Sequence, residues 1–368
     1  MDAFSDVLRF IRLSGGVFLE AKFCAPWCIS GRISTEDCAA FQVVPRHVIA
    51  LHFVASGQMQ LRVEDGETVK VQAGELILLP HNHAHIFGSE LAVAPVAARD
   101  IMRRAPMGDI ARIEHGGSGE ATQVLCGFLG TDTSFGPLLA ALPAVLKLNV
   151  RSTAFGTWIE SSFRFAVSQI AAGRIGSTTV IAKLSELLFV EAVSQYITTL
   201  PEDRHGWLAG LRDPNIGRAL AMLHASPARA WSAEALASDV GMSRSGFAER
   251  FSALVGQPPM QYLTFWRMHL AGVQLRESRN TIAQVGFGVG YESEAAFSKA
   301  FKRQFGVSPA AWRRTHAGQG RDTASQSLIS PEYLPAFAPF VSNCPSRPWN
   351  RAGMVTVNVW ENMRSPNS

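Results

Sequence analysis

The chain has 368 residues, of which 47% are hydrophobic and 17% are charged, and its formal net charge at pH 7 is +4. This length and apolar content predict a globular protein with two domains of ordinary size and connecting segments. It contains no run of 18 or more apolar residues, and the opening MDAFSDVLRFIR lacks the apolar core and cleavage site of an export signal, so we expect a cytoplasmic protein without a membrane span.

The cysteines are odd in number and irregularly spaced. Cys24, Cys28 and Cys38, with His47 nearby, offer thiolate and imidazole groups that suit zinc or a redox site, but paired CxxC spacing is absent. Free thiols in a reducing compartment are the alternative. The five are Cys24, Cys28, Cys38, Cys126 and Cys344.

Residues 1–151 have the pattern of short strands separated by turns. The strand-like runs HVIALHFV, MQLRVE, TVKVQ and ELILLP follow one another between His47 and Pro80. Asp65-Gly66 between two of them is a strong hairpin signal. Two further turns lie at Ser56-Gly57 and Ala73-Gly74. Several short strands at this spacing predict a β-sandwich or barrel.

Histidines cluster in the same region, at positions 47, 52, 81, 83 and 85. The alternation of His81, His83 and His85 would place them on one face of a strand, but they follow Pro80 and are predicted to lie in a loop. No HxH pair followed at short spacing by a glutamate precedes the GELILLP run, so we expect no metal and no other cofactor. His52 and His85, with Trp27 as an aromatic wall, are the candidates for a ligand pocket; structural roles are the alternative.

Two helical patterns follow, from Ala154 to Ala172 and from Thr178 to Thr199. The second has an apolar stripe that belongs either to the core or to a dimer interface. The stripe consists of Ile181, Leu184, Leu188, Ala192 and Tyr196. Residues 201–212 then form a polar linker anchored by Trp207.

The segment from Asp213 to His316 contains one helix-turn-helix pattern twice. The copies are SAEALASDVGMSRSGFAERFSALVGQPPMQYL from Ser232 and TIAQVGFGVGYESEAAFSKAFKRQFGVSPAAWR from Thr281, and a helix from Met260 to Glu277 is predicted between them. Equivalent positions are Ser243/Ser293, Phe247/Phe297, Phe251/Phe301, Gly256/Gly306 and Pro259/Pro309. In a DNA-binding protein the second helix of such a pair enters the major groove. An ordinary helical hairpin is the alternative interpretation, and the duplication favours DNA binding.

Two glycines distinguish the second copy from the first. Gly286 and Gly288 lie inside or near the end of its first helix. A glycine inside a helix costs about 0.5–1 kcal/mol relative to alanine. We therefore expect the second helix-turn-helix to be less stable than the first. Gly286→Ala should raise the melting temperature, unless close packing requires the glycine.

These motifs resemble a known family. GYESEAAFSKAFKRQFGVSPAAWR, together with the first copy, resembles the DNA-binding domain of the AraC/XylS transcription regulators over about a hundred residues. GELILLP and the histidines after it resemble the cupin-type sensor domain at the amino end of many such proteins. The resemblance implies an α+β protein of two domains: a cupin-like β-barrel or sandwich with following helices, and an all-α domain of two helix-turn-helix units.

The resemblance also implies which residues face DNA, because the family's two recognition helices enter successive major-groove segments. Base-facing candidates in the first helix are Arg244, Ser245, Ala248 and Glu249, and in the second Glu294, Ala295, Ser298 and Lys299. Candidates for phosphate contacts are Arg250, Lys302 and Arg303. The first helix has few long side chains, so specificity is expected to depend more on the second.

The charge distribution agrees with a DNA-binding role for this segment. Residues 213–316 contain 12 Lys or Arg and 7 Asp or Glu, a net charge of +5, whereas the whole chain carries +4. The remaining residues therefore sum to −1. A positive excess confined to one segment is expected where phosphate attraction supplies much of the affinity.

We therefore expect a sequence-specific, ligand-responsive transcription regulator and not an enzyme. The expected partners are double-stranded DNA, a small-molecule effector, RNA polymerase if the protein is an activator, and, as an open option, a second copy in a homodimer. The alternatives are a cupin-type metal-dependent enzyme fused to the helical domain, and an architectural DNA binder without a sensor. The predicted segments are a sensor at 1–151, helices at 152–200, a linker at 201–212, a DNA-binding domain at 213–316 and a flexible tail rich in proline and serine at 317–368.

Overall fold

The computed structural model describes residues 3–11, 13–34, 37, 38, 45–103, 111–131, 136–152, 158, 161, 162, 165, 168, 177–201, 206–316 and 354–357. These residues form two compact units, and each unit combines two separate parts of the chain. One contains residues 11–200 together with 354–357, and the other contains residues 3–10 together with 206–316. None of the described helices is long and apolar enough to cross a membrane.

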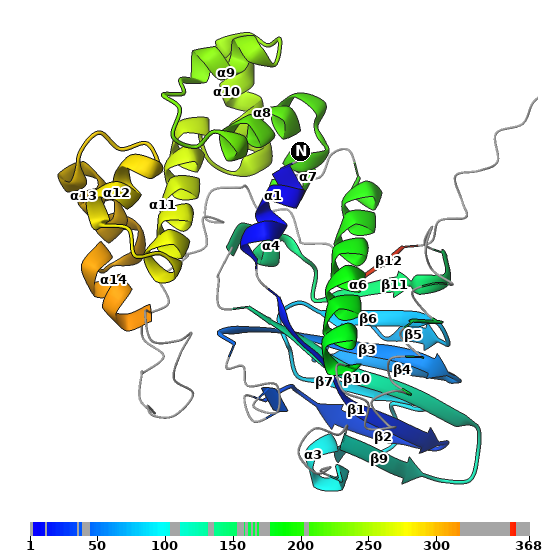
Figure 1. Cartoon of the computed structure of the whole chain (residues 1–368). Coiled ribbons are helices and arrows are strands. Elements are labelled where there is room, and N and C mark those ends of the chain that lie inside the picture. The colour runs from blue at the N-terminus through cyan, green and yellow to red at the C-terminus, as the bar shows by residue number, and fades with distance from the viewer. Residues whose placement is uncertain are drawn as a thin grey trace, which may run out of the picture. The chain divides into compact units, whose positions relative to one another are not determined.

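The first unit consists of two β-sheets (Figure 1). The larger has the strand order β12-β11-β6-β3-β10-β1-β9, and the smaller has the order β5-β4-β7-β2-β8. Its strands are β1 (Ser14–Cys24), β2 (Cys28–Gly31), β3 (His47–Ser56), β4 (Gln58–Val63), β5 (Val69–Gln72), β6 (Glu75–Leu79), β7 (His85–Gly88), β8 (Val96–Ala97), β9 (Ala111–Gly116), β10 (Ala121–Thr131), β11 (Val145–Asn149) and β12 (Met354–Val357). The four strand-like runs of the sequence are β3 to β6, which confirms the predicted sandwich.

The glycine turns have two different roles in this architecture. Asp65-Gly66 joins β4 to β5 as the predicted antiparallel hairpin. The other two turns carry the chain from one sheet to the other, because β3 and β6 lie in the larger sheet while β4 and β5 lie in the smaller. Gly57 and Gly74 have φ values of 75° and 86°, a backbone conformation that glycine adopts without steric cost.

An apolar core lies between the two sheets. It includes Phe23 and Trp27 near the end of β1, Leu61 in β4 and Phe87 in β7, all at most 3% exposed. The helix α6 (Ser177–Thr199) packs on the larger sheet, where it contacts β1, β10 and β11. In its apolar stripe Leu184, Leu188, Ala192 and Tyr196 are buried, so these residues belong to the core.

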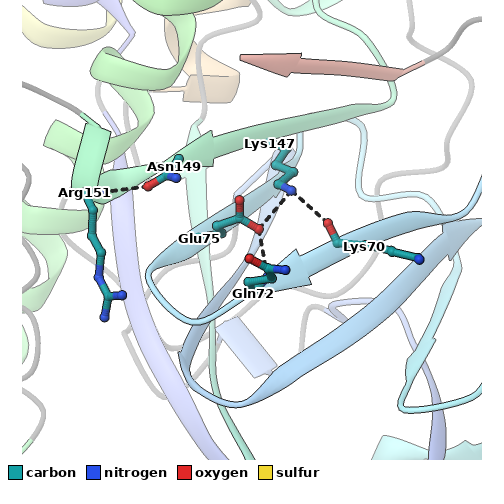
Figure 2. Close-up of polar contacts among 6 residues, drawn as sticks. All are labelled: Lys70, Gln72, Glu75, Lys147, Asn149 and Arg151. Carbon is teal, nitrogen blue, oxygen red and sulfur yellow. Dashed lines mark hydrogen bonds and ion pairs between the residues drawn. The ribbon is translucent and has the colours of Figure 1, made fainter. Parts of the chain in front are cut away.

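Glu75, from the GELILLP motif, joins strands instead of facing the histidines. Its carboxylate forms an ion pair with Lys147 of β11 at 2.8 Å and accepts a hydrogen bond from the Gln72 backbone at 2.7 Å (Figure 2). The ammonium of Lys147 also donates to the carbonyl of Lys70. Both charged side chains are about nine-tenths buried, and because each is paired, the charge is compensated. This contact connects β11 to β5 and β6.

The second unit is helical. The described α-helices with defined bounds, other than α6, are α1 (Ala3–Phe10), α3 (Ala98–Ile101), α4 (Gly136–Ala141), α7 (Trp207–Arg212), α8 (Pro214–Ala225), α9 (Ala233–Asp239), α10 (Arg244–Val255), α11 (Pro259–Glu277), α12 (Ile282–Gly288), α13 (Glu294–Phe305) and α14 (Pro309–His316). α1 and α7 to α14 make up this unit, in which α1 packs against α8.

The structure differs from the predicted segments at three places. α1 belongs to the helical unit although it lies within the predicted sensor segment. The predicted linker contains α7, which is helical because Trp207 and Leu208 are buried in that unit. Within the predicted flexible tail, Met354–Val357 pair in parallel with β11, consistent with the alternating valines of MVTV. Cys344 and most of the predicted helix at 154–172 lie outside the described residues.

Candidate nucleic-acid interface

The first helix-turn-helix is formed by α9 and α10. Ser232 caps α9 by accepting a hydrogen bond from the Ala235 backbone at 3.0 Å. Gly241, with φ 75°, follows the end of α9. Ser243 then caps α10 by accepting from the Gly246 amide, and Gly256, with φ 84°, ends α10 in the left-handed conformation. Ser243 and Gly256, two of the positions repeated in both copies of the sequence, therefore mark the start and the end of α10.

The second helix-turn-helix, formed by α12 and α13, has the same local geometry. Thr281 and Gln284 form a reciprocal capping box at the start of α12. Gly290, with φ 90°, occupies the turn. Ser293 caps α13, and Gly306, with φ 76°, ends it. The T-x-x-Q spacing of TIAQ is the sequence signature of this capping box and marks the start of α12.

The base-facing candidates lie on the open faces of the two recognition helices. Phe247 and Phe251 of α10, and Phe297 and Phe301 of α13, are fully buried on the opposite faces. Six of the candidates are exposed: Arg244, Ser245, Glu249, Glu294, Ala295 and Lys299. Ala248 and Ser298 are half-buried. The exposed side chains of each helix are thus accessible to a duplex.

The three candidates for phosphate contacts have different surroundings. Lys302 and Arg303 are exposed on α13. Arg250, although exposed, donates to Asp213 through Nε at 2.7 Å and Nη2 at 2.6 Å. Asp213 also caps α8 by accepting from Asn215 and Ile216. Arg250 therefore has a structural partner that ties α10 to the start of α8.

Tyr262 of α11 lies at the centre of a group of polar contacts that supports the first helix-turn-helix. Its hydroxyl accepts a hydrogen bond from Trp207 Nε1 at 3.1 Å and lies 2.7 Å from His224 Nε2. The His224 ring also stacks on Trp266 at 3.9 Å. Burial lowers the pKa of His224 to about 3, against a smaller opposing effect of the Ala3 backbone in α1. His224 is consequently neutral at pH 7, and its Nε2 can accept a hydrogen bond from the Tyr262 hydroxyl. Trp207 is the anchor that the sequence predicted.

The core beneath the second helix-turn-helix is formed by aromatic side chains. Phe301 contacts Phe305 and Trp312, with ring centroids 4.6 Å and 5.8 Å away. Trp312 Nε1 donates to the Gly272 carbonyl of α11 at 3.3 Å. Gly286 lies against the buried Phe297 ring, and an added Cβ would approach its Cγ to 3.0 Å. An added methyl group would press on this ring, which opposes the stabilisation that helix propensity predicts for Gly286→Ala.

The candidates for a ligand pocket lie together in the apolar core of the β unit. His52 in the larger sheet and His85 in the smaller are joined by a hydrogen bond of 2.8 Å between their Nε2 atoms. Trp27 belongs to the same aromatic cluster through Phe87, which lies 5.9 Å from Trp27 and 4.9 Å from His52 between ring centroids. Trp27 Nε1 is buried and has no hydrogen-bond partner among the described residues.

The proton positions in this cluster follow from its partners. Burial lowers the pKa values of His52 and His85, so both rings are neutral at pH 7. The His83 carbonyl can only accept, so His85 donates to it through Nδ1 and accepts through Nε2. His52 must then donate through Nε2 and accept the Cys126 thiol proton at Nδ1, 3.1 Å away. Burial raises the pKa of Cys126 to about 12, which keeps it protonated.

This chain of hydrogen bonds crosses between the two sheets and is complete without a metal ion. Within the described parts of the chain, no group of three or more His, Cys, Asp or Glu side chains is arranged to hold a metal. His81 and His83 lie in the loop between β6 and β7, as predicted, whereas His85 begins β7. The thiols of Cys24, Cys28, Cys38 and Cys126 are free.

Comparisons with known proteins cover both units. Residues 2–198 match the cupin family and residues 236–315 match a helix-turn-helix domain family. The chain is 30% identical over 321 residues to the HTH-type transcriptional regulator AlkR of Acinetobacter baylyi, covering 85% of this chain and 99% of AlkR. It is 34% identical over 320 residues to an AraC-like transcription regulator of Streptomyces lividans, covering 85% and 98%. A crystal structure of the DNA-binding domain of AdpA with target DNA is also similar, with 31% identity, a TM-score of 0.28, and coverage of 30% of this chain and 99% of that one.

Proposed function

The chain belongs to the AraC-like family of transcription regulators with a cupin domain and a helix-turn-helix DNA-binding domain, and we propose that its two units bind adjacent major-groove segments of one duplex. The observation that carries this proposal is the repetition of one exposed recognition helix, α10 and α13, on either side of α11. Both helices are capped by serine, bury two phenylalanines and expose their polar face. As relatives of this chain are transcription regulators, DNA binding is its activity.

The size of α11 supports two contacts on one side of DNA. α11 contains 19 residues, and at 1.5 Å per residue it is about 28 Å long. Successive major-groove segments on one face of B-DNA lie about 34 Å apart. A helix of this length, with a recognition unit at each end, is of the right order to place α10 and α13 in neighbouring segments.

The exposed residues divide into base and phosphate contacts. Lys299 is exposed in the middle of α13 and can donate to guanine edges, whereas Glu249 in α10 can accept from the cytosine amino group. Lys302 and Arg303 lie further along α13, and we assign them to phosphates. Arg250 contributes to phosphate binding with less freedom, because Asp213 already holds it.

Selection of DNA fragments with the purified full-length protein provides the operator on which these roles are tested. Lys299→Ala should weaken binding to that operator by about tenfold or more while affecting random DNA little. An equal loss on both would move Lys299 to the phosphate contacts. Arg303→Ala should reduce the slope of log affinity against log salt by about one unit. An unchanged slope would remove Arg303 from the interface.

The β unit is proposed to sense a small-molecule effector between its sheets. The buried cluster of His52, His85 and Trp27 supports this location, since Trp27 Nε1 is a buried donor that an acceptor atom of a ligand would satisfy. Thermal-shift screening of wild type and Trp27→Phe tests it. Compounds that stabilise only the wild type support the site, and compounds that stabilise both equally place the effector elsewhere.

Other partners are inferred from the regulatory role. If the protein activates transcription, RNA polymerase is its second macromolecular partner. A homodimer stays a prediction: α6 buries most of its stripe but leaves Val180 and Leu187 exposed. Sedimentation of the full-length protein over a concentration series measures the oligomeric state directly.

A further inference from the structure

The loop between α8 and α9 is a compact structure stabilised by its own hydrogen bonds. The Ser226 carbonyl accepts from Trp231 Nε1 at 2.9 Å and from the Arg229 amide at 3.2 Å. The Trp231 amide donates to the Arg229 carbonyl, and the Arg229 guanidinium lies over the Trp231 ring at 3.9 Å. This loop leads into the first helix-turn-helix, so its position is fixed to that unit.

Arg267 of α11 holds the loop through two hydrogen bonds. Its Nε donates to the Pro227 carbonyl at 2.7 Å and its Nη2 donates to the Arg229 carbonyl at 2.9 Å. The planar guanidinium presents these donors in a fixed fork, so two carbonyls two residues apart are held at once. A lysine at this position could not reproduce both bonds in that geometry.

The turn of the second helix-turn-helix packs directly on the same loop. A Cβ added to Gly290 would lie 2.7 Å from Ala228 Cα, 2.8 Å from the Ala228 carbonyl oxygen and 2.9 Å from Arg267 Nη2. Backbone therefore meets backbone, and no larger residue fits without separating the two parts. Tyr291, the next residue, lies near both Arg267 and Arg303: burial raises its pKa and the two guanidinium groups oppose that shift.

The corresponding turn of the first helix-turn-helix, between α9 and α10, makes no such contact. Gly241 has a similar φ of 75°, but nothing lies within 4 Å of an added Cβ. Both glycines allow the left-handed turn, and only Gly290 also allows an approach to a neighbouring unit. The two functions of glycine at this turn can therefore be separated experimentally.

We propose that Pro227, Ala228, Arg229, Arg267 and Gly290 form a clasp between the two helix-turn-helix units that fixes the register of α10 relative to α13. The clasp makes the protein discriminate operators by the number of base pairs between two half-elements. It rests on the proposed function, because it requires both units to bind one duplex. One inserted base pair shifts the second half-element by about 3.4 Å and rotates it by about 35°.

The clasp adds a second connection to the one that α11 supplies. α11 already contacts the second unit through Gly272 and Trp312, and Arg313 donates to the carbonyls of Leu275 and Asn280. That connection alone leaves the α12–α13 turn attached to the first unit only through the helix. With the clasp, the turn that precedes α13 is itself anchored to the loop that precedes α9.

The test measures affinity of the full-length protein for operators with one base pair added or removed between the half-elements. We expect the wild type to lose about tenfold or more with each change. Arg267→Ala should reduce this discrimination several-fold while binding the natural spacing more weakly. Arg313→Ala is the matched control: it removes an arginine clamp on two carbonyls that lies outside the clasp, so stability should fall but the spacing preference should not.

The glycine pair supplies a second variant set. Gly290→Ala and Gly241→Ala both place alanine at positive φ, but only Gly290→Ala pushes against Ala228. Gly290→Ala should therefore broaden or shift the spacing preference, and Gly241→Ala should retain it. Wild-type spacing profiles in both Arg267→Ala and Gly290→Ala would show that α11 alone sets the register and would overturn the clasp.

A separate arm distinguishes failure of the clasp from failure of the proposed function. In this arm each half-element is scrambled in turn at the natural spacing. Loss of affinity in both cases establishes binding by two units, and the spacing profiles then decide the clasp. If scrambling one half-element has no effect on the wild type, binding by two units is overturned and the clasp with it.

Discussion

The two helix-turn-helix units share their local structure and differ in what surrounds it. Serine caps and left-handed glycines occupy equivalent places in α10 and α13. The first helix-turn-helix is supported by hydrogen bonds of Tyr262 and by α1, α7 and α8, whereas the second is supported by closely packed aromatic rings and by α14. The repeated sequence thus specifies the helices and their turns, and the supporting core is specified separately in each unit.

This difference has a consequence for how each unit responds to change. A polar core is sensitive to protonation and to loss of a partner, because buried polar groups are costly when unpaired. An aromatic core is sensitive to volume, because close-packed interiors accommodate neither cavities nor extra atoms. Substitutions at equivalent positions should therefore have similar effects where the units share structure, and pH should affect them differently.

The largest expected effect is common to both units. Phe251→Ala and Phe301→Ala should each reduce the free energy of unfolding by about 3–5 kcal/mol, because both rings are fully buried on the inner faces of the recognition helices. Phe287→Ala is the control, since Phe287 is 55% exposed and should change stability by about 0.5 kcal/mol or less. Denaturant titration measures all three. A large loss for Phe287→Ala would indicate a packing partner for that ring.

Local features of the fold could be predicted from the sequence. Helix caps and stops are encoded within a few residues of each other, and so Ser243 and Gly256, which recur as Ser293 and Gly306, indicated the helix-turn-helix units. Alternation and Asp65-Gly66 likewise predicted the strands and the hairpin of the β unit. These signals are short-range, and they do not depend on how distant segments meet.

Contacts between distant segments could not be predicted in the same way. Arg267 and Pro227 are 40 positions apart, and no pattern in either stretch marks the other. Arg250 was assigned to DNA because an exposed cation on a recognition helix suits phosphate, but its partner Asp213 lies 37 positions earlier. Gly286 was assigned by helix propensity, and the Phe297 ring that fills the space beside it is visible only in the folded unit.

Acid should destabilise the first helix-turn-helix through protonation of His224. The folded pKa of about 3 lies below the unfolded value of 6.5, so the unfolded chain binds the proton first as the pH falls. Stability is full above pH 6.5 and decreases towards pH 3, by about 2 kcal/mol between pH 7 and pH 5. Melting temperatures of wild type and His224→Gln across this range measure the effect. The variant, which keeps a neutral polar side chain, should have a flatter profile; identical profiles would contradict the assignment.

The smallest expected effect separates two neighbouring glycines of α12. At Gly286 an added Cβ would lie 3.0 Å and 3.1 Å from atoms of the buried Phe297 side chain. Overpacking costs about 1–3 kcal/mol and exceeds the propensity gain, so Gly286→Ala should lower stability by about 1 kcal/mol. At Gly288 the nearest atom is the flexible Gln274 Oε1 at 3.8 Å, so Gly288→Ala should gain about 0.5–1 kcal/mol. Thermal melts of the two variants decide this: if both stabilise, Phe297 yields to the new methyl group, and the second unit is limited by helix propensity instead of by packing.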